Sequence, residues 1–389
     1  MYLTSFIHRK DLFNITEQWL CGRLEPNDGL RITQILICDS FVLSETLETL
    51  IELLLGMIYD GPFQKEDIHF KGELRDAICR STHCITPRVE ELLHQYKTNP
   101  DFFYREAPIN GTIFLNGHEY LLGLFRIKRP RRIAEKANRY IANWIFRMVQ
   151  DQAQKMAEER AQKLSIPIEN LLTSPEEMAQ EFIKAEEAIA KKFREGDIEL
   201  DRSAMTLHDI GGIKIVVDAE RLSHLEKLLT CHPGVKIVSK ENFCGNYQAN
   251  SLILEVSWNK EHICRRYVDG QAWKKYLNRG IPEDDLQKGL ESLLDGVEPT
   301  LNIELILSNF SDMVESEFGN SIHEERIIAQ RNNKVYKGNI PLNVEFLIEY
   351  LFGVGLSPRA CVDFLPIKLW GRYLPDTIST HIRQLYHIA

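Results

Sequence analysis

Short β-prone runs separated by helical stretches make up the middle of the chain, and this pattern constrains the fold more than any other feature. The runs are rich in Val, Ile and Leu and lie at 112–125, 213–217, 235–238, 252–256 and 301–307. Apolar residues recur at helical spacing between them, at 132–164, 175–194 and 219–229. We therefore predict an α/β (α+β) protein in which helices flank a mixed β-sheet.

Two local signals refine this pattern. The Asn-Gly pair at 116–117 separates two apolar runs and favours the positive φ angles of a type I′ turn, so it predicts a β-hairpin that ends near Phe125. The sequence Ser-Pro-Glu-Glu at 174–177 is a capping box with Pro at the first helical position. It predicts that a helix begins there and runs to about Arg194.

The length of 389 residues predicts two or three domains, because one domain usually spans roughly 150 residues. Residues 1–105 show mainly helical periodicity and are predicted to form a helical N-terminal domain. Residues 106–335 are predicted to form the sheet-containing core, with helical inserts near 150–195 and 258–300. Residues 336–389 then form a mixed or helical C-terminal segment.

Composition argues against two classes of partner. The net charge is −9, whereas proteins that bind nucleic acids or membrane surfaces in general carry an excess of Lys and Arg. The most apolar stretch, 41–59, contains three glutamates and is predicted to be an amphipathic helix and not a membrane span. The first ten residues lack the pattern of a secretory signal, so we expect a cytoplasmic protein.

A local excess of positive charge lies between residues 126 and 139, where the only acid is Glu135. The basic residues are Arg126, Lys128, Arg129, Arg131, Arg132, Lys136 and Arg139. Arg126 and Lys128 leave a predicted strand on one face, while Arg132, Lys136 and Arg139 share one face of the following helix. Together they suit a polyphosphate, although a solvated helix face paired with acids elsewhere is an alternative.

Two acids stand beside or within apolar strands. Asp209 precedes Gly211-Gly212 and the run 213–217, and glycines there allow the backbone to approach a ligand closely. Glu304 lies in the middle of the run 301–307, where a buried carboxylate needs a metal ion or another cation as partner. An ordinary loop at Asp209 and an edge strand with Glu304 facing water are the alternatives.

Taken in order, these features resemble the synthetase domain of the RelA/SpoT family. The run 126–136 is similar to the signature RxKxxxSxxxK, with Arg132 in the position of the serine. Residues 209–214 are similar to DxxGxR, with Lys214 in place of the arginine. Glu304 lies where the glutamate of EIQIRT would fall. The resemblance implies a nucleotidyltransferase-like core.

Two further blocks carry the resemblance towards the C-terminus. Tyr247 looks like the tyrosine of NGYRSLH, although its neighbours differ. Residues 317–323, ending in His323, resemble ExGxxxH. The resemblance covers about residues 120–335, and it is weakest on the acceptor side, where Ile306 and Ser308 replace a glutamine and an arginine of the family pattern.

The resemblance implies transfer of a pyrophosphoryl group from ATP to the ribose 3′-hydroxyl of GDP or GTP, which forms (p)ppGpp and AMP. Asp209 and Glu304 would hold Mg²⁺ and act in catalysis, and Glu304 would help to deprotonate the attacking hydroxyl. The implied ATP-phosphate ligands are Arg126, Lys128, Arg132 and Lys136. The implied acceptor ligands are Tyr247, His323 and Lys214.

Other functions remain open on the sequence alone. The departures on the acceptor side leave room for another nucleotide or an RNA 3′ end, including a tRNA end, as acceptor. A degenerate nucleotide-binding module that engages a protein partner is a second hypothesis. A polymerase-β-like nucleotidyltransferase ranks last, because the chain lacks a Gly-Ser pair followed by Asp-x-Asp on one strand.

Overall fold

A computed structural model describes residues 1–81, 85–244, 247–319, 323–332 and 338–388. Its centre is a seven-stranded mixed β-sheet with the order β2-β3-β4-β6-β9-β8-β7. The strands are β2 (Phe63–Phe70), β3 (Pro108–Asn116), β4 (Leu121–Ile127), β6 (Gly211–Val216), β7 (Val235–Cys244), β8 (Gln248–Ser257) and β9 (Thr300–Ser308). All neighbours are antiparallel except β6 and β9, which run parallel. The predicted mixed α/β fold is confirmed at this level.

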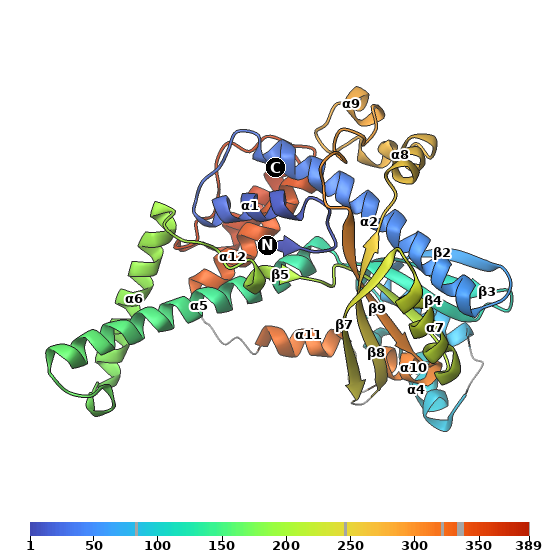
Figure 1. The fold of residues 1–389 in the computed structure, drawn as a ribbon, viewed down its shortest axis with the longest axis horizontal. Coiled ribbons are helices and arrows are strands. Elements are labelled where there is room, and N and C mark those ends of the chain that lie inside the picture. Colours follow the sequence, from blue (N-terminus) through green and yellow to red (C-terminus); the bar gives the residue numbers. More distant parts are fainter. Residues whose placement is uncertain (82–84, 245–246, 320–322, 333–337, 389) are drawn as a thin grey trace.

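Helices cover both faces of the sheet (Figure 1). The α-helices are α1 (Arg9–Leu20), α2 (Asp28–Ile58), α3 (Lys71–Arg80), α4 (Pro87–Thr98), α5 (Pro130–Lys163), α6 (Pro175–Glu195), α7 (Ala219–Cys231), α8 (Lys260–Asp269), α9 (Glu283–Gln287), α10 (Phe310–Phe318), α11 (His323–Asn332), α12 (Asn339–Leu356) and α13 (Pro375–Leu385). Four short 3₁₀ helices lie at 100–103, 168–170, 203–205 and 272–276. A separate parallel pair joins β1 (Tyr2–Leu3) to β5 (Thr206–Leu207).

Alternation along the central strands divides the apolar side chains between two cores. Ile213 and Ile215 of β6 join the larger core, which also contains side chains of α2, α5 and α12. Leu124 and Val216 join the smaller core on the opposite face, with side chains of α3, α4 and α10. In β9 the odd-numbered positions 301–307 all enter the larger core. Glu304 therefore lies on the face of the smaller core.

The region predicted as a helical N-terminal domain, residues 1–105, is not entirely helical, because it also contains β1 and β2. It contributes β2, which pairs with β3 at the edge of the central sheet. Its helix α2 packs in the same core as β6 and β9. β2 escapes a periodicity analysis because most of its side chains are polar and exposed, as edge strands often are. The sheet therefore includes chain on both sides of residue 105.

The predicted hairpin is confirmed, but its predicted turn is wrong. β3 and β4 are joined by the four residues 117–120, and the residue with positive φ is Glu119, at 61°. The side-chain oxygen of Asn116 accepts hydrogen bonds from the backbone N–H groups of His118 and Tyr120, each at 2.9 Å. Asn116 thus stabilises a wider turn by side-chain bonding, which is a common alternative to the type I′ conformation.

The predicted inserts are helical. α5 and α6 form an arm that extends away from the sheet (Figure 1), and the capping box at 174–177 begins α6 as predicted. The segment between β8 and β9 contains α8 and α9. In the C-terminal segment, α12 packs against α2 and α5. Within the described residues, no helix combines the length and apolarity needed to cross a bilayer.

Candidate functional site

The sheet register brings predicted site residues from three strands into one row. Arg126 of β4 lies opposite Gly212 of β6, and Gly212 lies opposite Glu304 of β9. A Cβ atom at Gly212 would lie 3.6 Å from Oε2 of Glu304, which is an ordinary contact distance. Because Gly212 has no side chain, the space between Arg126 and Glu304 is left open. Its φ angle is not positive, so its backbone conformation does not itself require glycine.

Two lysines converge on Asp209 at the start of β6. Nζ of Lys128 lies 3.0 Å from Oδ2 of Asp209, and Nζ of Lys136 contacts the same oxygen. Lys128 leaves the end of β4 and Lys136 lies in the second turn of α5. Between 21% and 23% of each of these three side chains is exposed, so the cluster is accessible to solvent. A bound anion can therefore compete with Asp209 for both ammonium groups.

Partial burial and the neighbouring opposite charges together shift the pKa values of Asp209 and Lys128. Burial raises the pKa of Asp209, but Lys128 and Lys136 outweigh burial and hold the pKa well below its usual range. Burial lowers the pKa of Lys128, and Asp209 offsets only part of that effect. Asp209 is thus a stable carboxylate at neutral pH.

Glu304 is held differently from Asp209. Burial raises its pKa above the ordinary value, and the neighbouring charge of Asp209 raises it further, while Lys128, Lys136 and Arg126 act in the opposite direction. Its one hydrogen bond among the described residues comes from Oγ of Ser251 at 3.4 Å. Its carboxylate makes no direct ion pair within the described part of the chain. A half-buried carboxylate of this kind is suited to bind a cation or to accept a proton.

Asp209 and Glu304 could together hold a divalent metal ion. Carboxylate oxygens are the ligands that Mg²⁺ prefers, and Mg²⁺ commonly takes one or two carboxylates with phosphate oxygens and water. The raised pKa of Glu304 means that a cation beside it would be stabilising. The donor set therefore fits Mg²⁺ accompanied by a polyphosphate, whose negative charge Lys128 and Lys136 could balance.

Arg132 does not join this cluster in the structure. Its guanidinium donates to Oε2 of Glu135 at 2.8 Å and to the side-chain oxygen of Gln330 at 3.3 Å. Its Nε is buried without a hydrogen-bond partner among the described residues. Arg126 lies close enough to the site to stabilise the ionised forms of Glu304 and Glu317.

The residues predicted to bind the acceptor differ from one another in their burial and contacts. Lys214 is buried, with 7% of the residue exposed, and Nζ donates to Oγ of Ser316 at 2.6 Å. Burial lowers the pKa of Lys214 to about 8. The ring of Tyr247 is half-buried and has the guanidinium of Arg326 6.0 Å from its centroid. His323 begins α11, but its side chain lies outside the described residues.

Sequence reasoning missed a buried charge network beside these residues. Nζ of Lys71 lies 2.7 Å from Oε2 of Glu317 and 3.3 Å from Oε1 of Glu324. Nη2 of Arg75 lies 3.2 Å from Oε2 of Glu324, and its Nε donates to the backbone oxygen of Glu317 at 3.0 Å. The lysine and arginine come from α3, more than 240 residues before their partners. No local signal in a single sequence connects such distant charges.

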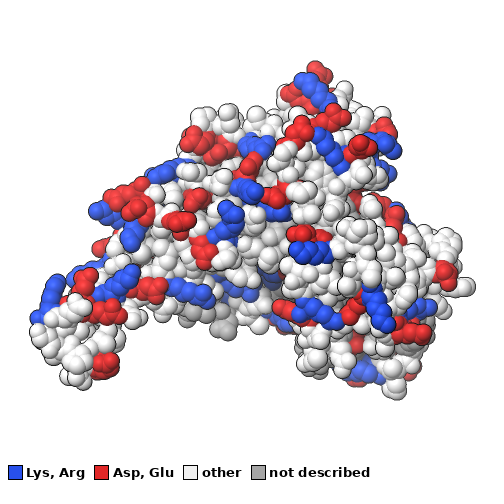
Figure 2. Space-filling model, in the orientation of Figure 1, with Lys and Arg blue, Asp and Glu red and all other residues white. Residues whose placement is uncertain are grey.

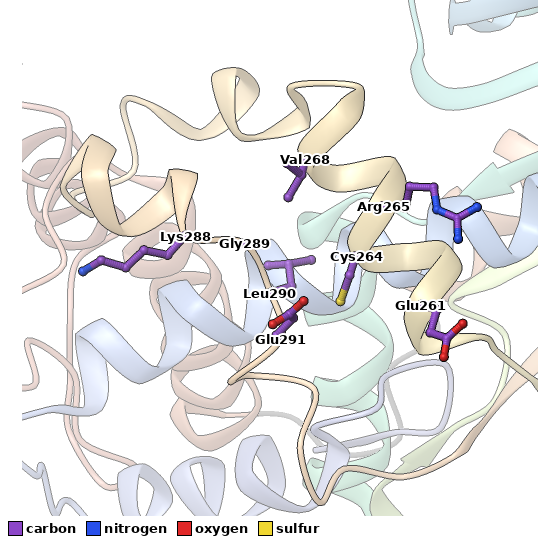
Figure 3. Close-up of a pocket in the computed structure, with 8 residues that line it drawn as sticks. All are labelled: Glu261, Cys264, Arg265, Val268, Lys288, Gly289, Leu290 and Glu291. Carbon is purple, nitrogen blue, oxygen red and sulfur yellow. The ribbon is translucent and has the colours of Figure 1, made fainter.

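A cavity lies away from these residues. It has a volume of 390 Å³ and is bounded by α8 and residues 288–291, with Cys264 and Glu261 on the helix side (Figure 3). A second cavity of 180 Å³ lies between the start of α1 and residues 292–298. Neither contains a residue of the predicted site, so the candidate site is a partly exposed cluster at the sheet and not one of these cavities.

Comparisons with known proteins identify no relative. No protein-family model matches the chain, and neither the curated proteins nor the solved structures contain a significant match.

Proposed function

We propose that this chain is an ATP-dependent pyrophosphotransferase of the RelA/SpoT type, with a nucleotidyltransferase-like core and a cytoplasmic location. It would move the β,γ-pyrophosphate of ATP to the 3′-hydroxyl of a nucleotide acceptor, with GDP or GTP favoured. The observation that carries the proposal is the clustering of Lys128, Lys136 and Asp209 beside Glu304. These are the residues for which the resemblance implies phosphate and Mg²⁺ binding.

The chemistry assigned to each residue follows from its surroundings. Lys128 and Lys136 would move from Asp209 to the phosphate oxygens of ATP and donate hydrogen bonds to them, because charge-assisted bonds to phosphate are strong. Mg²⁺, held by Asp209 and Glu304, would neutralise charge on the transferred group. Arg126, across Gly212 from Glu304, would stabilise the same charge.

The transfer step balances as an in-line displacement. The acceptor 3′-oxygen bonds to the β-phosphorus of ATP, the bond from that phosphorus to the α,β-bridging oxygen breaks, and AMP leaves. The proton of the 3′-hydroxyl would pass to the carboxylate of Glu304. Catalysis would depend mainly on positioning and electrostatics.

A second candidate function is nucleotide binding without catalysis, coupled to a protein partner. It is favoured by the pairing of Arg132 with Glu135 and Gln330 and by the burial of Lys214 against Ser316. Arg132 and Lys214 are both predicted to bind substrate, but in the structure each contacts other residues of the chain. Turnover, and not binding, distinguishes the two functions.

Transfer of label tests the proposal. Purified protein would be incubated with Mg²⁺, γ-labelled ATP and, separately, GDP, GTP, ATP or bulk tRNA. We expect label in GDP or GTP and its loss in Glu304→Gln. The matched control is Glu298→Gln, which removes a carboxylate that pairs with Arg9 and Lys10. ATP binding without transfer to any acceptor would favour the non-catalytic candidate, and label in tRNA would identify an RNA acceptor.

A further inference from the structure

Helix α11 is attached to the rest of the molecule mainly through polar side chains. Among residues 324–332, Glu324 and Ile327 are half-buried and all the others are exposed. The preceding helix α10 is different, because it buries Phe310, Met313 and Phe318, among others. α11 therefore lacks the apolar seam that holds most helices of globular proteins in place.

The N-terminal end of α11 is attached to the charge network of α3. Glu324 pairs with Lys71 at 3.3 Å and with Arg75 at 3.2 Å. Both cationic side chains are almost fully buried, with 4% and 0% exposed, and only 11% of the side chain of Glu324 is exposed. The hydroxyl of Tyr104 adds a hydrogen bond to Glu325. The carboxylate of Glu324 is therefore shielded from solvent.

The C-terminal end of α11 is attached to the start of α5 by more exposed groups. Arg331 forms an ion pair with Glu135, in which 56% of the arginine side chain but only 8% of the glutamate side chain is exposed. The side-chain oxygen of Gln330 accepts a hydrogen bond from Arg132 at 3.3 Å. Exposed ion pairs contribute little to stability in water and are screened by salt. This end of the helix is therefore the weaker attachment.

Between these attachments α11 lies beside Tyr247, one of the residues predicted to bind the acceptor. Figure 1 shows α11 crossing the space between α5 and the β7–β8 end of the sheet. Arg326 in its middle lies over the ring of Tyr247, 6.0 Å from the centroid. Burial is the main cause of the lowered pKa of Lys214, and Arg326 adds to it, so α11 lies within electrostatic range of β6. The helix thus contacts residues assigned to both substrates.

We propose that α11 is a lid over the nucleotide site, which pivots at Glu324 and is latched at Arg331 by ion pairing to Glu135. The inference rests on the proposed function. Arg132 connects the latch to the substrate, because a phosphate group would compete with Gln330 for the N–H groups of its guanidinium. A phosphate is the stronger partner. Nucleotide binding therefore removes one of the contacts that hold the latch closed, and opening of the latch admits nucleotide.

Hydrogen–deuterium exchange of the unsubstituted chain without ligand tests the latch. We expect amides of 326–332 to exchange at least about tenfold faster than those of 313–318, because exposed, polar attachments favour local opening. Raising NaCl from about 0.05 M to about 0.5 M should accelerate exchange in α11 several-fold and leave α10 unchanged. Equal protection of the two helices, or exchange in α11 that is insensitive to salt, would overturn the proposal.

Association kinetics test whether the latch controls access. The rate constant for binding of a fluorescent N-methylanthraniloyl ATP with Mg²⁺ would be measured by stopped flow for Arg331→Glu, which opposes Glu135, and for the matched control Arg331→Lys, which keeps the pair. We expect association about fivefold faster in Arg331→Glu than in the control, with circular dichroism unchanged.

The outcomes separate the lid from the proposed function. If all variants bind the nucleotide at the same rate, the lid is wrong and the proposed function is unaffected. If no variant, including the unsubstituted chain, binds the nucleotide, the proposed function is wrong and the lid over a nucleotide site is wrong with it.

Discussion

The donor and acceptor halves of the candidate site differ in how their charges are paired. In the donor half, Lys128, Lys136 and Asp209 pair with each other while about a fifth of each side chain remains exposed. In the acceptor half, Lys214 is buried against Ser316, and Glu317 is buried against Lys71. Groups that remain accessible can exchange an internal partner for a ligand, whereas buried pairs are held by the cost of leaving a charge without a partner.

This difference indicates that the two halves respond differently to substitution. We expect changes in the donor half to affect function with little effect on stability, and changes in the acceptor half to affect stability as well. On the surface shown in Figure 2, Lys and Arg are interspersed with Asp and Glu, so the surface charges do not distinguish the two halves of the site.

Glu304→Gln should separate function from stability most clearly. We expect transfer to fall by at least about 10³-fold, equivalent to about 4 kcal/mol, because the substitution removes the carboxylate that we propose as both metal ligand and base. The pKa of Glu304 is higher in the folded protein than in the unfolded chain. The free energy of unfolding therefore falls as pH rises from the unfolded pKa to the folded pKa, and this loss is complete at higher pH. Thermal unfolding of Glu304→Gln at neutral pH should therefore occur at the same or a higher temperature.

The control for this prediction is Glu298→Gln, whose carboxylate is paired outside the site. A Glu304→Gln protein that retains transfer within tenfold of the unsubstituted chain would remove Glu304 from the catalytic assignment. A clear loss of stability would show that Glu304 is a structural residue like Glu317.

Lys71→Met should instead reduce stability. Loss of this partner leaves Glu317 buried, with Arg75 at 3.9 Å as its remaining cation within α3. Removing one member of a buried pair typically costs about 3–5 kcal/mol of unfolding free energy. Urea denaturation would measure this loss. The double variant Lys71→Met, Glu317→Gln should recover much of it, and a double variant as unstable as the single one would contradict the account.

Lys214→Arg should change the pH dependence of acceptor use. The pKa of Lys214 in the folded protein is about 8, so its positive charge is present below that pH and is lost above it. We expect kcat/KM for the acceptor to fall about tenfold by about pH 9, because about nine-tenths of the lysine is then neutral. Arginine remains charged, so the decline should disappear in Lys214→Arg. An unchanged profile would show that Lys214 does not contact the acceptor.

The lowered pKa of Lys214 also predicts a stability effect. In the unfolded chain Lys214 keeps its proton up to about pH 10.4, whereas in the folded protein it loses the proton above about pH 8. The free energy of unfolding therefore increases as pH rises from about 8 towards about 10.4. Comparison of unfolding free energies of the lysine and arginine chains across this range isolates the contribution of residue 214 from those of other groups.

The donor half could be predicted from the sequence to a useful extent because its residues lie at the ends of well-patterned elements. Lys128 follows a strand, Lys136 lies near the start of a long helix, and Asp209 precedes an apolar strand. The order of the strands could not be predicted, since pairing of β4 with β6 and of β6 with β9 depends on contacts between distant segments. The sequence alone therefore cannot predict that Asp209 lies close enough to Glu304 to raise its pKa.

Three other features could not be predicted for physical reasons. Edge strand β2 is too polar to show an apolar alternation. The turn after Asn116 is determined by side-chain hydrogen bonds that compete with the type I′ geometry. The pairing of Lys71 with Glu317 joins residues 246 positions apart, and charged residues carry no periodic signal that would indicate burial.

Calorimetric titration of a non-hydrolysable ATP analogue, with and without Mg²⁺, tests most directly whether Lys136, Asp209 and Glu304 form one metal and nucleotide site. The account predicts that Mg²⁺ tightens binding at least about tenfold in the unsubstituted chain, that Glu304→Gln removes this enhancement, and that Lys136→Met weakens binding about tenfold. The matched control Lys155→Met, at an exposed position farther along α5, should bind normally. Binding that is equal in all variants and indifferent to Mg²⁺, or no binding at all, would contradict the account.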